Sequence, residues 1–172
     1  VTHFVPMATL TPGAANSKPY VGKVVLTEIM YKATDGVDFL ELQNISNDTV
    51  KLYDKDEPNN TWRVGGISFN FPPNTVIYPG QIIVLIDDTI SVDDFRQKYG
   101  MDSNIPVFPY TGGLQGNGET IKLEKPRPSY YDEDMNQVFP YMLMDWVTYG
   151  TSAPWPEDAN GKGKSLNRIK KD

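Results

Sequence analysis

The sequence predicts an all-β domain: a β-sandwich with Greek-key connections, eight or nine strands and one short helix. Its 172 residues are 39% hydrophobic and 22% charged, a composition that can bury one core. Glycine and proline number 14 each, which favours many tight turns over long helices. Short apolar alternations with turn signals between them recur along the chain, and this pattern is typical of sandwiches.

The domain boundary is expected near residue 22. Residues 1–22 are rich in proline, alanine, glycine and serine without periodicity, so we expect a linker or lead-in segment there. The sandwich domain is then expected over 23–172. The chain starts at Val1 with neither a methionine nor a signal-like segment, which is typical of a fragment or a mature form.

The first half of the domain is expected to hold a series of strands. An alternation places Leu40 and Leu42 on the strand face opposite Glu41. Residues 82–86 are continuously apolar and follow a Pro-Gly turn, so we expect a strand buried on both faces. The extended segments expected in this half are 23–31, 37–46, 49–54, 61–71 and 75–87.

One helix is expected, over residues 91–100. Ser91 is a suitable N-cap, and Asp94 stands at the capping-box position three residues later. Phe95 lies on the apolar face of the predicted helix, and Gly100 can terminate it.

The second half of the domain is expected to contain fewer strands and one long irregular segment. Residues 111–125 form a glycine-rich approach to a strand, and residues 126–141 form an irregular acidic and aromatic segment. Further strands are expected at 142–150 and 164–169.

Charge and residue content disfavour several classes of function. The net charge of −6 gives no excess of lysine and arginine for phosphates, so nucleic acid is not an expected partner. No apolar run reaches about 18 residues, so direct membrane insertion is not expected. There is no cysteine, and the single histidine, His3, lies in the lead-in segment. Because the commonest general base is missing from the domain and no nucleophile–base pair or metal cluster is visible, we expect no enzyme.

An ordered set of motifs runs from residue 24 to residue 169. The motifs are EIMY (28–31), FLELQN (39–44), the strand of Trp62, FPPNTVIYPGQIIVL (71–85), FRQKYG (95–100), GGLQGNGETIKL (112–123), DWVTYG (145–150) and APWPEDANGKGKSL (153–166). In order and spacing they resemble the lamin tail domain family. The last motif resembles the branch found in secreted and surface proteins of bacteria.

The resemblance implies an immunoglobulin-like sandwich without a shared catalytic centre. It implies an accessory module beside other domains of the same polypeptide, in a bacterial protein that is secreted or displayed on the cell surface. Trp62, Glu28 and Glu41 match the family's pattern, so we expect structural roles for them. The two glutamates would then accept hydrogen bonds from backbone or from Asn44, although two carboxylates on neighbouring strands also suit acid–base work on a glycosidic bond.

Trp155 stands between two prolines in the last motif. We expect its indole to plug one end of the sandwich at little conformational cost, as buried aromatics do in such folds. The alternative is an exposed tryptophan that stacks on sugars.

Two segments depart from the family's pattern, DKDEPNN (54–60) and residues 126–141. Function specific to this protein is expected there, because loops carry function on a rigid sandwich. Aromatic residues gather in the second segment and suit binding of a protein or a glycan, neither of which the sequence identifies. The alternative is that they pack the loop onto the sheet. The candidate binding residues are Tyr130, Tyr131, Phe139 and Tyr141.

The second segment also contains a candidate metal site. Asp132, Asp134 and Asn136 alternate like the first half of a calcium loop. Gln137 and Leu143 stand where an EF-hand has glycine and glutamate, which leaves a looser calcium site or a solvated acidic loop. No cofactor other than calcium is expected.

These observations together predict a non-catalytic secreted or cell-surface module for protein interaction or domain presentation within a larger protein. The alternatives are a carbohydrate-binding accessory domain of an extracellular hydrolase and a calcium-stabilised envelope spacer.

Overall fold

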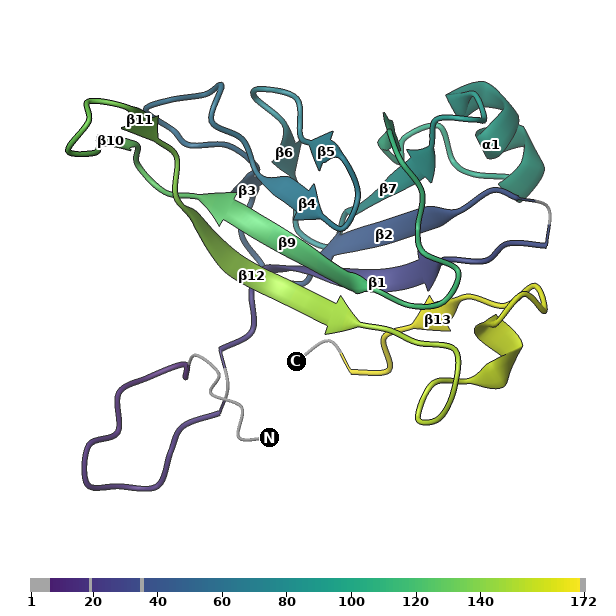
Figure 1. Cartoon of the computed structure of the whole chain (residues 1–172), viewed down its shortest axis with the longest axis horizontal. Coiled ribbons are helices and arrows are strands. Elements are labelled where there is room, and N and C mark those ends of the chain that lie inside the picture. The colour runs from purple at the N-terminus through teal and green to yellow at the C-terminus, as the bar shows by residue number, and fades with distance from the viewer. Residues whose placement is uncertain (1–6, 19, 35, 171–172) are drawn as a thin grey trace.

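The computed structural model describes residues 7–18, 20–34 and 36–170, and it shows two β-sheets packed face to face (Figure 1). The first sheet has the strand order β13-β1-β2-β7-β8 and the second β12-β9-β4-β5. The strands of the first sheet are β1 (Val24–Met30), β2 (Phe39–Asn44), β7 (Ile82–Asp87), β8 (Val107–Tyr110) and β13 (Leu166–Asn167). Those of the second sheet are β4 (Arg63–Gly65), β5 (Phe69–Asn70), β9 (Thr120–Pro126) and β12 (Tyr141–Thr148). The predicted all-β sandwich is confirmed.

The described residues hold thirteen strands rather than the eight or nine expected. The difference arises because β8, β10 (Tyr130–Tyr131) and β11 (Gln137–Val138) were not expected, and because the expected segments 61–71 and 75–87 each hold two strands. Two short ladders pair β3 (Val50–Lys51) with β6 (Val76–Ile77), and β10 with β11. Strands of two residues carry no periodicity that a sequence pattern can show.

The main hydrophobic core lies between the sheets and contains the side chains predicted for it. Leu40 and Leu42 are fully buried there, whereas Phe39 points to the outer face of the first sheet. Strand β7 is buried on both faces as expected, because Ile83 enters the main core and Val84 packs on the outer face. This outer face is covered by helix α1.

Helix α1 (Val92–Tyr99) begins and ends as predicted. The backbone N–H of Asp94 donates to Ser91 Oγ at 3.1 Å, and Gly100 adopts the left-handed conformation with φ of 59°. Phe95 is buried, and its ring packs edge-on against Phe39. The helix also joins β7 to β8, which pair in parallel, and the sequence analysis missed β8. A parallel pair needs a long crossover, and here the crossover contains the helix.

Two segments fold differently from expectation. Residues 61–71 were expected to run on as one extended segment, but β4 and β5 form a hairpin within them. Gly66 makes the turn with φ of 101°, where a Cβ would lie 2.6 Å from Ile121 Cδ1. Residues 126–141 were expected to be irregular, but β10 and β11 form a hairpin that projects beyond the ends of β9 and β12 (Figure 1).

The lead-in segment makes few contacts with the sandwich. The backbone N–H of Ala8 donates to Lys18 O at 3.0 Å and closes a loop. This loop projects away from the two sheets (Figure 1). Residues 1–6 and 19 of the expected lead-in segment lie outside the described residues.

Candidate functional site

The two segments that depart from the family's pattern contact each other. Ser129 Oγ donates to Glu57 Oε1 at 2.8 Å, and Asn60 Nδ2 donates to the carbonyl oxygen of Arg127 at 3.2 Å. The sequence separates these partners by 72 and 67 residues, so only the fold brings them together. The region expected to carry specific function is therefore one continuous surface.

An open groove of about 890 Å³ lies between these segments, and we call it the insertion groove. Its floor comes from β4 and β5 of the second sheet, and its walls come from the 54–60 loop and the β10–β11 hairpin. The lining residues are Glu57, Pro58, Asn59, Asn60, Thr61, Arg63, Asn70, Gln137, Phe139 and Tyr141.

Tyr141 is held firmly in this groove. The guanidinium carbon of Arg63 lies 3.8 Å from the centre of the Tyr141 ring, and Arg63 Nε donates to Glu124 Oε2 at 2.8 Å. The Tyr141 hydroxyl donates to the carbonyl oxygen of Thr61 at 3.3 Å. Tyr141 therefore packs onto the sheet, as the packing alternative expected, and it also lines the groove.

The other predicted aromatics do not pack onto the sheet. Tyr130, Tyr131 and Phe139 are 54%, 63% and 46% exposed. Phe139 lines the insertion groove, whereas Tyr130 and Tyr131 lie on β10, outside it. The exposure of these three side chains favours binding over packing for them.

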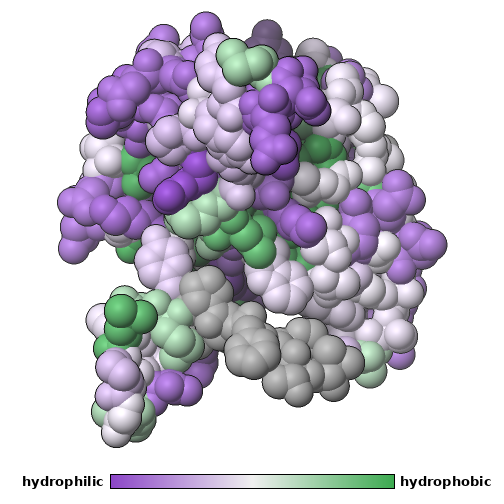
Figure 2. All heavy atoms as spheres, turned by 60° about the vertical axis from the view of Figure 1, so that its left-hand side comes forward, coloured by the Kyte–Doolittle hydropathy of each residue, from purple (hydrophilic) through white to green (hydrophobic). Residues whose placement is uncertain are grey.

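Exposed apolar side chains extend from the hairpin along β12, the edge strand of the second sheet. Figure 2, which brings the hairpin side of the molecule forward, shows apolar side chains exposed among polar ones on this face. The exposed apolar residues of the two elements are Tyr130, Tyr131, Met135, Phe139, Met142, Leu143 and Trp146. Exposed apolar patches rimmed by polar residues commonly mark interaction sites.

The predicted calcium ligands form a turn. Asp132 Oδ1 accepts hydrogen bonds from the backbone N–H of Asp134 at 3.0 Å and of Asn136 at 2.8 Å. Within the described residues, no three acidic, histidine or cysteine side chains converge on one point. Asp132 therefore closes its own turn, and calcium stays a prediction.

A chelator decides between the calcium site and the solvated acidic loop, and the contacts of Asp132 favour the loop. Because Asp132 is already bound by amides of its own turn, we expect EGTA to leave the melting temperature within about 1 °C of its value in calcium. A fall of several degrees that Asp134→Asn abolishes, but Glu133→Gln does not, would instead establish the calcium site and the envelope-spacer alternative.

Glu28 and Glu41 lie directly opposite each other on β1 and β2. Glu28 accepts a short hydrogen bond from Ser165 Oγ, and Glu41 accepts one from Thr27 Oγ1 at 2.5 Å. Their partners are thus hydroxyl groups, not the backbone or Asn44 as expected. Asn44 is instead fully buried, where its Nδ2 donates to the carbonyl oxygens of Asp48 and Ile77 at 2.7 and 3.0 Å.

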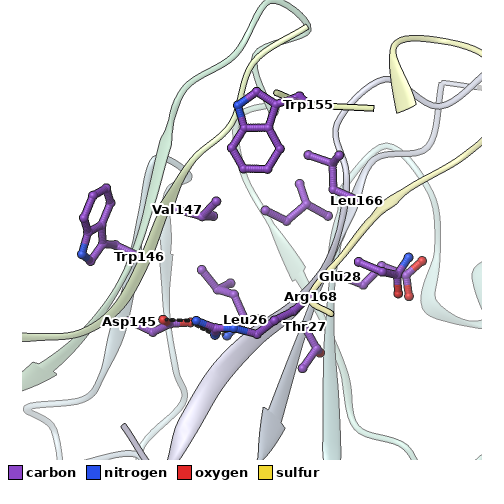
Figure 3. Close-up of a pocket in the computed structure, with 11 residues that line it drawn as sticks. Leu26, Thr27, Glu28, Asp145, Trp146, Val147, Trp155, Leu166 and Arg168 are labelled. Atoms are coloured by element: carbon purple, nitrogen blue, oxygen red, sulfur yellow. Dashed lines mark hydrogen bonds and ion pairs between the residues drawn. The ribbon is translucent and has the colours of Figure 1, made fainter. Parts of the chain in front are cut away.

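Trp155 was expected to plug one end of the sandwich. In the structure it is only partly buried against the main core. Its half-buried ring lines a cleft of about 220 Å³ between β12 and the β1–β13 pair. In Figure 3 the Trp155 ring points into this cleft, where Val147 and Leu166 face each other, and Trp146 points away from it. Trp62, by contrast, is 2% exposed within the main core.

The floor of this cleft holds an ion pair that sequence analysis missed (Figure 3). Arg168 donates to the two carboxylate oxygens of Asp145 at 2.7 and 3.0 Å. The backbone N–H of Leu26 donates to Asp145 as well, at 2.8 Å. No sequence signal identifies this pair, since Asp145 lies on β12 of the second sheet and Arg168, 23 residues later, follows β13 of the first.

Two buried tyrosines have strongly raised pKa values. Burial raises the pKa of Tyr110 and of Tyr149, and neighbouring carboxylates, among them Asp38 for Tyr110 and Glu119 for Tyr149, add to the effect. The Tyr149 hydroxyl donates toward Gln115 O and Glu119 Oε1, each at 3.0 Å. Both phenols therefore stay protonated in the folded chain.

The raised pKa values of Tyr110 and Tyr149 predict that the folded chain loses stability in alkali. An unfolded tyrosine ionises near pH 10, so the contribution of each buried tyrosine to the free energy of unfolding should be fully present below pH 10 and be lost as the pH rises above it. Each buried tyrosine contributes up to about 1.4 kcal/mol per pH unit to that fall. Urea titrations between pH 8 and 11 should show it. Tyr149→Phe should reduce the slope, while the half-exposed control Tyr78→Phe should not; a flat profile to pH 11 would contradict the assignment.

A scan against protein-family models found no match, and a search of curated proteins found no relative. The resemblance to the lamin tail family therefore rests on the motifs. Among the helices that the structure describes, none is long and apolar enough to span a membrane.

Proposed function

We propose that this chain is a non-catalytic, lamin-tail-like module that binds a partner protein, within a larger protein that a bacterium secretes or displays on its surface. The observation that carries the proposal is the contact between the two departing segments. It builds one surface from the 54–60 loop and the β10–β11 hairpin, supported by a rigid sandwich.

The exposed aromatics support a protein partner. Tyr130 and Tyr131 stand on a short hairpin at more than half exposure, where their rings can be buried only by another molecule. Tyrosine is enriched in protein interfaces because it supplies large contact area at low entropic cost. The non-catalytic part of the proposal rests on the sequence, which has no cysteine and has its single histidine in the lead-in segment.

Site-specific photo-crosslinking tests this function. A photoreactive phenylalanine analogue placed at Tyr131 of the full-length protein should give a discrete crosslinked partner in the native host. The matched control is the same analogue at Tyr78, which is 56% exposed on the β6–β7 turn. Tyr130→Ala should weaken the crosslink from position 131. Identical products from positions 131 and 78, or none from 131, would contradict a protein-binding hairpin.

The insertion groove supports carbohydrate binding as a second candidate. Phe139 and Tyr141 offer ring faces there, and Asn59, Asn70 and Gln137 offer amide groups that can hydrogen-bond sugar hydroxyls. A carbohydrate-binding accessory domain of an extracellular hydrolase would use this combination.

Affinity electrophoresis separates the two candidates. In gels that contain xylan, glucomannan or mixed-linkage β-glucan, a glycan-binding chain should be retarded, and Phe139→Ala should abolish the retardation. Tyr78→Ala should migrate like the parent chain. If the parent chain migrates freely through every polysaccharide, and is not retained on cellulose or chitin, the carbohydrate candidate is rejected.

A further inference from the structure

A second cleft lies on the outer face of the first sheet, beside helix α1. It has a volume of about 400 Å³ and is bounded by the helix, residues 101–105 and the loop at 163–165. We call it the helix cleft. It shares no lining residue with the insertion groove, and in Figure 1 helix α1 and the β10–β11 hairpin lie at opposite ends of the sandwich.

Two carboxylates line this cleft side by side. Glu28 and Glu41 are direct partners in the β1–β2 ladder, so their Cβ atoms are about 5 Å apart on the same face. Like charges in this position destabilise a sheet. Each carboxylate accepts a hydrogen bond from one neutral hydroxyl, and within the described chain neither forms an ion pair. The cleft therefore brings together two carboxylates that form no ion pair within the described chain, although Lys164 also lines the cleft.

The walls of the cleft are aromatic and apolar. The centres of the Phe95 and Tyr99 rings lie 4.6 Å apart, and the centres of the Phe39 and Tyr99 rings lie 5.6 Å apart. Met101 and Ile105 extend this wall and are half-buried. A surface of this kind packs against an alkyl stem, and an aromatic ring attracts a cation held over its face.

We propose that the helix cleft binds an arginine side chain of a partner protein. A guanidinium is planar, presents five donors and can bridge two adjacent carboxylates while it stacks on an aromatic ring. A calcium ion fits less well, because it needs six or more oxygen ligands and the helix side of the cleft is aromatic and apolar. The chain's net charge of −6 also favours approach by a basic partner. The proposal does not depend on the insertion groove.

Nuclear magnetic resonance titration of the 15N-labelled chain tests this proposal. The probe is N-acetyl-arginine methylamide, and N-acetyl-citrulline methylamide has nearly the same shape without the charge. The arginine probe should produce saturable shifts in the amide signals of Glu28, Glu41 and Met101. The citrulline probe should bind at least about tenfold more weakly, since it lacks the charge-assisted hydrogen bonds.

Two double variants complete the test. Glu28→Gln with Glu41→Gln keeps an acceptor for each hydroxyl, and it should weaken arginine binding at least about tenfold while the chain still unfolds cooperatively. Glu133→Gln with Asp134→Asn removes two exposed charges from the distant hairpin and should leave arginine binding unchanged. No saturable shift in the parent chain, equal binding of citrulline, or equal losses in the two double variants would overturn the proposal.

Discussion

Asp145→Ala is expected to lower the free energy of unfolding by about 3 kcal/mol, the lower end of the usual loss for a buried ion pair, because the Arg168 side chain keeps 30% exposure. The Asp145 side chain is 10% exposed and accepts hydrogen bonds from Arg168 and from the backbone of Leu26. It thereby ties β12 of the second sheet to β1 of the first. Its removal leaves a guanidinium and an amide without their partner at the floor of the Trp155 cleft. Urea denaturation monitored by circular dichroism measures the loss.

Two control variants test whether the loss in Asp145→Ala comes from the unpaired Arg168. Replacing both members, with Asp145→Leu and Arg168→Met, should recover part of the loss, because no uncompensated charge then remains. Lys55→Ala removes an ion pair with Asp56 in which both side chains are more than 70% exposed, and it should change stability by less than about 1 kcal/mol. A loss below about 1 kcal/mol in Asp145→Ala as well would show that the pair does not tie the sheets together.

Trp62→Ala is expected to cost a similar amount, about 3–5 kcal/mol, because deleting a buried aromatic leaves a large cavity. Trp62 is 2% exposed, and its backbone N–H donates to Leu52 O at 2.9 Å within the main core. Trp155→Ala should cost less, about 1–2 kcal/mol, since the half-buried Trp155 ring loses less contact area. Thermal and urea unfolding of the two variants should rank them in this order.

The reverse order would contradict this account of the two tryptophans. If Trp155→Ala cost as much as Trp62→Ala, the Trp155 indole would seal the sandwich as fully as the sequence analysis expected. Trp155→Phe is the matched variant, because it keeps a ring over the cleft and should recover part of the loss.

The location of the insertion groove was partly predictable. The two segments that depart from the lamin-tail pattern were expected to carry specific function, and in the structure they form the groove together. That they touch each other was not predicted, because Glu57 and Ser129 are 72 residues apart in the chain. The sequence left open whether Tyr130 and Tyr131 are exposed for binding or packed on the sheet, since a tyrosine on a short strand suits a buried and an exposed position equally well.

The sequence by itself determined the features that depend on near neighbours: the α1 caps at Ser91 and Gly100, the opposite faces of Leu40 and Glu41, and the two-sided burial of β7. Side-chain direction in a strand and hydrogen bonding at a helix end are set within a few residues, so a local pattern reports them. Only the tertiary structure decided the parallel pairing of β8, the Asp145–Arg168 ion pair and the two facing carboxylates of the helix cleft. Each of these depends on which strands become neighbours and in what register, and that is settled by packing across the whole core.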